Sequence, residues 1–230
     1  TLPLLILVTG LGVFIITRFF SEPVAFLQTT TFKIIALILA LSGQGIRMFT
    51  VGYTPANTSG RNRFYQLADK VNTTGIYSTV RHPLYLGNFI IWLGIAMLTE
   101  NIWFIFIFIL TYWIYYERIM YAEEMFLYNK FNGVYQKWAV KTPAFIPDMS
   151  KYESPGLPFS WKKVLKKEKN GISAIFALFF IFDFTGNIIE AGRFVIELNF
   201  WFYAALGTFI LYLILKYLKW NTSVLDEEGR

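Results

Sequence analysis

Long apolar stretches alternate with polar segments along this chain. Six such stretches can be distinguished, at residues 2–20, 32–51, 84–98, 102–116, 172–189 and 200–218. A straight membrane-spanning helix needs about 20 predominantly apolar residues, and four of the six stretches approach that length. The pattern therefore predicts an all-α, polytopic transmembrane protein with about six membrane segments.

The third and fourth stretches differ from the others because they are short and almost continuous. Only the sequence Thr-Glu-Asn at 99–101 separates them, so we expect a tight antiparallel helical hairpin over residues 84–116. Good helix formers follow the fourth stretch and no breaker occurs before Gly133. The second helix of the hairpin is therefore predicted to continue beyond the bilayer.

Composition supports the membrane assignment. The chain has 230 residues, of which 55% are hydrophobic and 16% are charged, whereas about a quarter of the residues of a soluble domain are charged. The absence of cysteine excludes disulfides, thiolate chemistry and cysteine-ligated metals, and we predict no metal site. The first apolar stretch lacks a basic leader and a small-residue cleavage site, which indicates a retained helix rather than a signal peptide.

The distribution of Lys and Arg predicts the orientation in the membrane. The polar regions 52–83 and 129–171 are rich in these residues, whereas the links 21–31 and 99–101 contain none. Basic loops stay on the cytoplasmic side, so we expect a multi-pass protein with both large polar regions facing the cytoplasm. The net charge of +6 lies in these few loops, which indicates topology and attraction to anionic lipids rather than nucleic-acid binding.

Three consecutive regions are expected: N-terminal membrane helices at 1–51, a core at 52–149, and a C-terminal region at 150–230. The last region begins with the basic run "WKKVLKKEKN" at 161–170, which predicts an amphipathic helix at the membrane surface. Further on, Asp183, Asn187 and Glu190 share one helical face. They are either polar groups inside the membrane, or the membrane span ends near Phe182 and this helical face lies in water at the outer membrane surface.

The segment "RHPLYLGN" at 81–88 stands where the polar region 52–83 meets the short third stretch. Pro83 suits the first turn of a helix, where its missing N–H costs nothing. Taken alone, Arg81 and His82 are most simply membrane-surface anchors. The paired carboxylates of Glu123 and Glu124, near the point where a membrane helix leaves the bilayer, are costly without partners and favour a functional interpretation.

The order of several elements resembles the isoprenylcysteine carboxyl methyltransferase family and the related phospholipid methyltransferases. The matching elements are "TTGIYSTVRHPLYLGN" from Thr73, the short helical hairpin, the glutamate pair followed by Leu127, then "FNGVYQKW" and a closing "PAFIP". The resemblance covers residues 72–147. It implies an integral membrane enzyme that transfers a methyl group from S-adenosylmethionine to a lipid or lipid-linked acceptor at the cytoplasmic face.

The resemblance also implies which residues form the site. The expected cofactor contacts are Asn72, Tyr77, His82, Pro83, Leu84, Tyr85 and Glu123. The family places an arginine shortly before the glutamate pair, on the acceptor side, and Arg118 is the nearest match. Its spacing of five residues from Glu123 turns it about 140° away around the helix.

The residue types agree with this interpretation. S-adenosylmethionine carries a cationic sulfur, an amino-acid group and a purine, so its site needs a carboxylate, ring faces and hydrogen-bonding groups. An anionic carboxylate or phosphate acceptor needs no proton removed, and Arg118 would hold it. An amine acceptor needs a base, for which Glu123 or Glu124 is the candidate.

Two other classes of function remain open at this stage. Membrane sterol and steroid reductases that use NADPH have a broadly similar helical arrangement, although Leu84 and Asn88 stand where their motif would place other residues. A non-catalytic membrane scaffold is the second alternative. The sequence does not determine the methyl acceptor or the oligomeric state.

Overall fold

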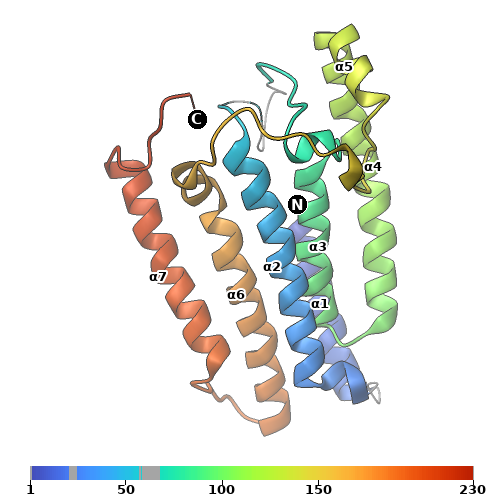
Figure 1. The fold of residues 1–230 in the computed structure, drawn as a ribbon. Coiled ribbons are helices and arrows are strands. Elements are labelled where there is room, and N and C mark those ends of the chain that lie inside the picture. The colour runs from blue at the N-terminus through green and yellow to red at the C-terminus, as the bar shows by residue number, and fades with distance from the viewer. Residues whose placement is uncertain (1, 21–24, 57, 59–67, 230) are drawn as a thin grey trace. The chain divides into compact units, whose positions relative to one another are not determined.

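The computed structural model describes residues 2–20, 25–56, 58 and 68–229, so the loop arginines Arg61 and Arg63 lie outside the described residues. These ranges contain seven α-helices and short 3-10 turns, and no strand is assigned in them (Figure 1). The predicted all-α class is confirmed. The helices are α1 (Leu2–Phe20), α2 (Thr30–Tyr53), α3 (Pro83–Met97), α4 (Ile102–Phe131), α5 (Gly133–Ala139), α6 (Trp161–Ala191) and α7 (Phe200–Asn221).

Five of the described helices are long and apolar enough to cross a membrane: α1, α2, α4, α6 and α7. Helix α3 is shorter, with 15 residues, and reaches only about 22 Å at 1.5 Å per residue. Helix α4 has 30 residues, about 45 Å, so it exceeds the hydrocarbon core of about 30 Å. Both features of the hairpin, the short first helix and the extended second one, agree with the sequence prediction.

The chain divides into two compact units, each assembled from separate stretches. The first unit contains residues 1–44, 89–112 and 169–214, and the second contains 45–88, 113–168 and 215–230. Each unit takes residues from all three of the consecutive regions expected from the sequence.

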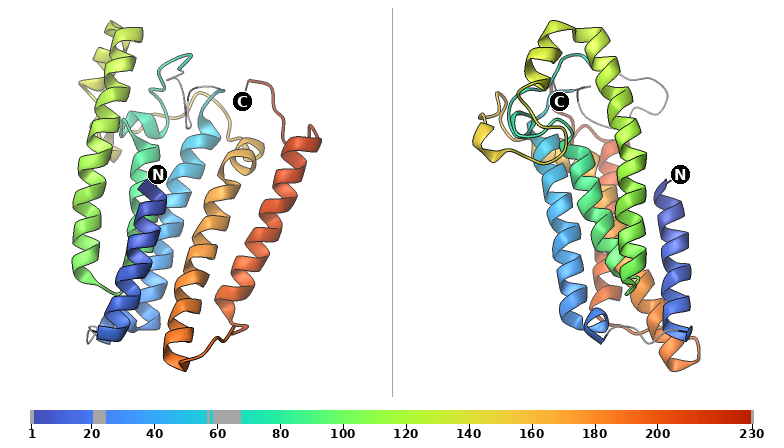
Figure 2. Two further views of the ribbon diagram at one scale, coloured as in Figure 1. Left: turned by 180° about the vertical axis from the view of Figure 1, so that it is seen from behind. Right: turned by 90° about the vertical axis from the view of Figure 1, so that its right-hand side faces the viewer.

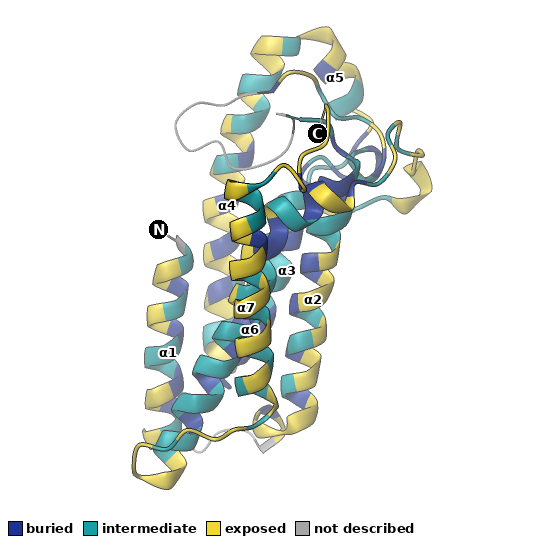
Figure 3. Ribbon diagram, turned by 90° about the vertical axis from the view of Figure 1, so that its left-hand side faces the viewer, coloured by how far each residue is buried: buried dark blue, intermediate teal, exposed yellow. Residues whose placement is uncertain are grey.

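The core of the first unit is formed by side chains from α1, α2, α3 and α6, whose stretches in this unit run beside one another (Figure 2). Phe14 meets Phe182 edge to face, and Ile95 and Ile175 are fully enclosed. Figure 3 shows the buried positions on the inner sides of the helices and the exposed ones on the outer sides. Large apolar side chains such as Phe209 on α7 remain exposed, as expected for helices that face lipid.

Helices α2 and α3 make a close backbone contact in the first unit at Gly94. A Cβ atom at this position would lie 2.5 Å from the carbonyl oxygen of Ala36 and 2.9 Å from the backbone nitrogen of Ala40. Both alanines are fully buried. Small residues spaced four apart allow this kind of approach between membrane helices.

We therefore expect Gly94→Ala to destabilise the protein, because the helix backbones must move apart to admit a methyl group. The expected loss is about 1–3 kcal/mol, seen as a lower midpoint of thermal unfolding in detergent. Gly12→Ala is the matched control, since a Cβ on Gly12 meets nothing within 4 Å and gains up to about 1 kcal/mol of helix propensity. Equal midpoints for the two variants would show that the contact is not tight.

The second unit contains the polar segments between the helices, and backbone hydrogen bonds join two of these segments. Its chain from 143 to 153 runs back along residues 75–81, since Arg81 N–H donates to the Pro143 carbonyl at 2.9 Å and Gly75 N–H donates to the Glu153 carbonyl at 2.9 Å. Trp138 of α5 adds a bond from its indole N–H to the Tyr77 carbonyl at 3.0 Å. These bonds fix the segment that precedes α3.

The basic run at 161–170 differs from the sequence prediction. It is the first part of the continuous helix α6 rather than a separate surface helix, and two of its lysines, Lys163 and Lys169, are buried. Lys163 Nζ donates to the Thr54 carbonyl at 2.6 Å and to the Pro55 carbonyl at 3.0 Å. The polar loop after α2 thus supplies acceptors that the periodicity of the run alone does not reveal.

Candidate active site

The segment before α3 is a tight turn that buries polar residues. A 3-10 turn covers Ile76–Ser78, and Gly75 adopts a positive φ of 63°, which glycine accepts without steric cost. Helix α3 begins at Pro83, as its preference for the first helical turn predicts. His82, directly before it, is only 6% exposed. The turn therefore holds the imidazole inside the second unit.

The partners of His82 are the two consecutive glutamates of α4. His82 Nε2 lies 2.8 Å from Glu124 Oε1, and His82 Nδ1 lies 3.7 Å from Glu123 Oε2. The first distance is a hydrogen bond and the second is an ionic contact. The side chains of adjacent helical residues point about 100° apart. The two carboxylates therefore leave α4 in different directions, and the imidazole bridges them.

Arg81 completes this cluster. Its Nη1 lies 3.2 Å from Glu124 Oε2, so Glu124 is shared between an arginine and a histidine. The Nε of Arg81 is buried and has no hydrogen-bond partner among the described residues. The same is true of the hydroxyl of Tyr135 on α5, whose side chain is almost fully buried. Two donors are thus left unsatisfied next to the Arg81–Glu124 pair.

The state of the Tyr135 hydroxyl follows from its surroundings. Burial and then the charge of Glu124 raise the pKa of Tyr135 to about 12, although the positive charge of Arg81 acts in the opposite direction. The hydroxyl therefore stays protonated at neutral pH and remains a hydrogen-bond donor.

Aromatic rings line the other side of the cluster. The Tyr85 ring stacks on His82 at a centroid distance of 5.5 Å and meets Tyr116 edge to face at 5.3 Å. Tyr77 lies close by, and burial followed by the charge of Glu123 raises its pKa well above the usual value, although a hydrogen bond with Asn72 opposes this. The rings are neutral and offer flat apolar faces beside the carboxylates.

Arg47 of α2 forms the rear of this region. It makes two bonds to Glu168, from Nε at 2.9 Å and Nη2 at 2.7 Å, and a third from Nη1 to Asn88 at 2.8 Å. Arg47 is thus held in a bidentate ion pair, and its positive charge is near enough to Tyr77 to act on the pKa of that residue.

His82 is under two opposing influences. Burial alone lowers the pKa of its imidazole, but the hydrogen bonds and charges of Glu123 and Glu124 outweigh burial, and the pKa is raised above the ordinary value of 6.5. The imidazole of His82 is therefore protonated more readily in the folded protein than in the unfolded chain.

This shift gives a pH-dependent contribution to stability. A raised folded pKa stabilises the protein fully below the unfolded value, and that contribution is lost as the pH rises from about 6.5 through the folded pKa. We expect the unfolding midpoint of the wild type to fall over this interval more steeply than that of His82→Gln, which cannot be protonated. Parallel pH profiles in differential scanning fluorimetry would contradict the ion contacts.

The structure brings most of the residues predicted for the site together. His82 contacts Tyr85, Glu123 and Glu124, and Tyr85 also interacts with Glu123. Tyr77 with Asn72 adjoins them, whereas Pro83 and Leu84 form the first turn of α3. Asn72 also donates to the Thr58 carbonyl at 2.9 Å.

Arg118 does not join this cluster. It is exposed on α4, and no hydrogen bond or ion pair to another described residue is found for it. Its assignment to the site stays a prediction. The arginine that contacts Glu124 is Arg81, which sequence reasoning treats as a surface anchor although it stands directly beside His82. Tyr135 is the other missed residue, and its signal was its place in the matching segment "FNGVYQKW".

Comparison with known proteins agrees with this architecture. Residues 31–133 match the model of the family described as phospholipid methyltransferase. The chain is 33% identical over 121 residues to the nickel-cobalt-cadmium resistance protein NccN of Alcaligenes xylosoxydans xylosoxydans, covering 52% of this chain and 54% of that protein. It is 37% identical over 89 residues to protein-S-isoprenylcysteine O-methyltransferase of Schizosaccharomyces pombe, covering 39% and 36% of the two chains.

A second relative of the latter kind is protein-S-isoprenylcysteine O-methyltransferase of Saccharomyces cerevisiae, 28% identical over 130 residues, with 56% of this chain and 54% of that protein covered. The chain spans about half the length of the curated relatives it matches, or less. No solved structure matches it.

The fold and the cluster define a polytopic helical membrane protein in which a buried histidine contacts two partly exposed glutamates, one of which also pairs with an arginine. Residues 31–133 match the phospholipid methyltransferase family model, and the resemblance of this chain to the isoprenylcysteine and phospholipid methyltransferases is confirmed. That segment includes Arg81, His82 and both glutamates, and it ends just before Tyr135.

Proposed function

We propose that this protein transfers a methyl group from S-adenosylmethionine to a lipid or lipid-linked acceptor. The observation that carries the proposal is the contact of His82 with both Glu123 and Glu124 at 3.7 and 2.8 Å, inside the segment that matches a methyltransferase family. A neighbouring apolar hairpin suits an acceptor that reaches the site from the membrane.

The residues of the cluster fit the methyl donor. A cationic sulfur and an ammonium group match the Glu123 carboxylate and the ring faces of Tyr85 and Tyr116. The unsatisfied donors, Arg81 Nε and the Tyr135 hydroxyl, match an anionic group, either the carboxylate of the donor or an anionic acceptor. When bound, S-adenosylmethionine supplies an electrophilic methyl group.

The protein residues then act mainly by binding and orientation. Glu124 is held between His82 and Arg81, at 2.8 and 3.2 Å, so its carboxylate is engaged and its role is to position these two cations. An anionic carboxylate or phosphate acceptor loses no proton, and the site only has to align the reacting atoms and exclude water. An amine acceptor would require Glu123 or Glu124 to take its proton.

Calorimetric titration of the purified protein with S-adenosylhomocysteine and, separately, with NADPH tests this assignment. We expect saturable binding of S-adenosylhomocysteine and none of NADPH. Binding of NADPH alone would identify a reductase, and binding of neither by a folded protein would favour a scaffold.

We also propose that the site faces the cytoplasm, in line with the basic residues of 52–83 and 129–171. The chain contains no cysteine, so single cysteines introduced at Thr58 and Asn170 report their location without background. Both should resist a membrane-impermeant maleimide added to intact cells and react after the cells are opened. Labelling of either position in intact cells would contradict the orientation.

A further inference from the structure

A cavity of about 80 Å³ lies in the first unit. It is enclosed by parts of α1, α2, α6, the start of α7 and the link between α3 and α4. By the same measure a single water needs about 10–15 Å³, so the cavity accommodates a small polar group. None of the residues that line it belongs to the cluster around His82.

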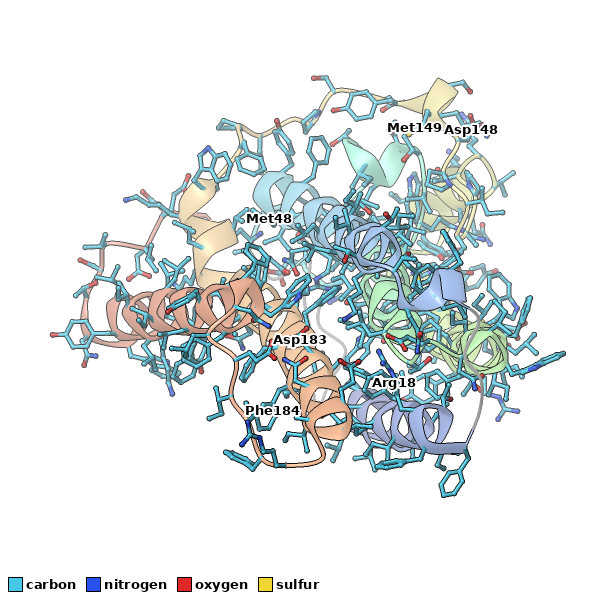
Figure 4. All side chains as sticks on the ribbon, turned by 90° about the horizontal axis from the view of Figure 1, so that it is seen from below. Arg18, Met48, Asp148, Met149, Asp183 and Phe184 are labelled. Atoms are coloured by element: carbon cyan, nitrogen blue, oxygen red, sulfur yellow. The ribbon has the colours of Figure 1, made fainter. Side chains whose placement is uncertain are left out.

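Charged side chains surround this cavity. Glu100, Asp183, Glu190 and Lys33 line it. Arg18 stands behind two of them, with Nη2 at 2.8 Å from Glu100 and Nη1 at 2.7 Å from Glu190. Figure 4 shows Arg18 of α1 and Asp183 of α6 directed into the space between these helices.

The charges do not balance. Lys33 Nζ lies 3.9 Å from Asp183, so the two cations, Lys33 and Arg18, face three carboxylates and one negative charge remains. Glu190 is 64% exposed at its side chain, so this excess charge is partly solvated, and it attracts a further cation to the cavity.

Glu100 identifies where that cation is needed. Its side chain is 2% exposed, and its Oε2 has no hydrogen-bond partner among the described residues. An unsatisfied, buried carboxylate oxygen is a strong acceptor without a donor. Arg18 engages only the other oxygen, so Oε2 is free to receive a ligand from the cavity.

Aromatic rings specify the kind of cation. Phe14, Phe32, Phe179, Phe182 and Trp201 contribute to the wall, and the Phe179 and Trp201 rings stack at 5.0 Å. Ring faces together with carboxylates bind organic ammonium groups. A metal ion would need converging ligands, and no group of three His, Cys, Asp or Glu suited to a metal occurs in the part of the chain that is described.

We propose that this cavity binds an organic ammonium group, with Glu100 as its principal charge partner. The group comes from either a free amine or the headgroup of a membrane lipid, since both present the same chemistry. The site does not depend on the function proposed for the His82 cluster.

The test uses the full-length protein in nanodiscs of phosphatidylglycerol. Choline is titrated against 3,3-dimethyl-1-butanol, its uncharged isostere, with tryptophan emission as the signal because Trp201 lines the cavity. We expect saturable binding of choline only. Glu100→Gln should weaken it at least about tenfold by removing a direct charge partner, whereas His82→Ala should leave it unchanged.

Glu190→Gln covers the case in which Glu100→Gln does not fold. Glu190 is 64% exposed at its side chain, so its replacement is tolerated, and it too should weaken choline binding. Loss of the choline signal in nanodiscs that contain phosphatidylcholine would identify the lipid headgroup as the source, and its persistence a free amine. Equal responses to choline and the isostere, unchanged affinity in the folded glutamine variants, or displacement of choline by Ni²⁺ or Co²⁺ would overturn the proposal.

Discussion

Replacing His82 by alanine is expected to weaken the binding of S-adenosylhomocysteine on the order of 10- to 100-fold. His82 bridges Glu124 at 2.8 Å and Glu123 at 3.7 Å, and its loss leaves two carboxylates without their shared cation. Losing a charge-assisted bond of this kind costs about 1–3 kcal/mol, which corresponds to that change in affinity. Isothermal titration calorimetry in detergent measures it directly.

Glu123→Gln should have a similar effect, because a neutral amide attracts neither the sulfonium nor the imidazolium. Glu117→Gln is the matched control, since Glu117 lies on the same helix α4 but is exposed. Both glutamine variants should retain the wild-type helical content by circular dichroism. If Glu123→Gln and His82→Ala bind S-adenosylhomocysteine as tightly as the wild type, the cofactor site lies elsewhere.

The second large effect is expected at Arg81. Arg81→Lys should lower turnover on the order of 10- to 100-fold, because lysine offers a point charge where the planar guanidinium holds Glu124 through Nη1 and presents an unsatisfied Nε. Arg118→Lys should change turnover less than about twofold, as for most exposed substitutions. The two variants carry the same substitution, arginine to lysine, at two positions of the second unit, so each is a control for the other.

The opposite result would assign the acceptor contact to Arg118, as the resemblance implies. Glu124→Gln extends the comparison to the class of acceptor. It should lower turnover moderately if Glu124 only positions His82 and Arg81, and should abolish turnover at neutral pH if an amine acceptor needs this carboxylate as its base.

Much of the fold follows from the sequence because membrane helices are long, apolar and locally encoded. The six apolar stretches correspond to α1, α2, α3, α4, α6 and α7, and the extension of α4 follows from the lack of a breaker before Gly133. The continuity of α6 was missed because lysines in its first turns look like a surface helix. The burial of Lys163 depends on the carbonyl groups of Thr54 and Pro55, more than a hundred positions away.

The site could be predicted in part because some of its features are also encoded locally in the sequence. His82 and the glutamates stand out as ionisable groups at helix ends, and the order of the surrounding elements identifies them. The choice between Arg81 and Arg118 depends on whether the loop before α3 turns Arg81 inward. That loop is held by long-range bonds, such as the one from Arg81 N–H to the Pro143 carbonyl. The unsatisfied Tyr135 hydroxyl likewise depends on how α5 packs, which helical periodicity does not specify.

The central claim, methyl transfer at the His82 cluster, is tested most directly by one assay. The purified protein is incubated with S-adenosylmethionine labelled in its methyl group and with a lipid extract of its own membranes, and the label in the extracted lipids and lipid-linked proteins is measured. The account predicts label transfer by the wild type and by Arg118→Lys, and its near-complete loss in His82→Ala. No transfer by a folded wild type that binds S-adenosylhomocysteine, or undiminished transfer by His82→Ala, would contradict it.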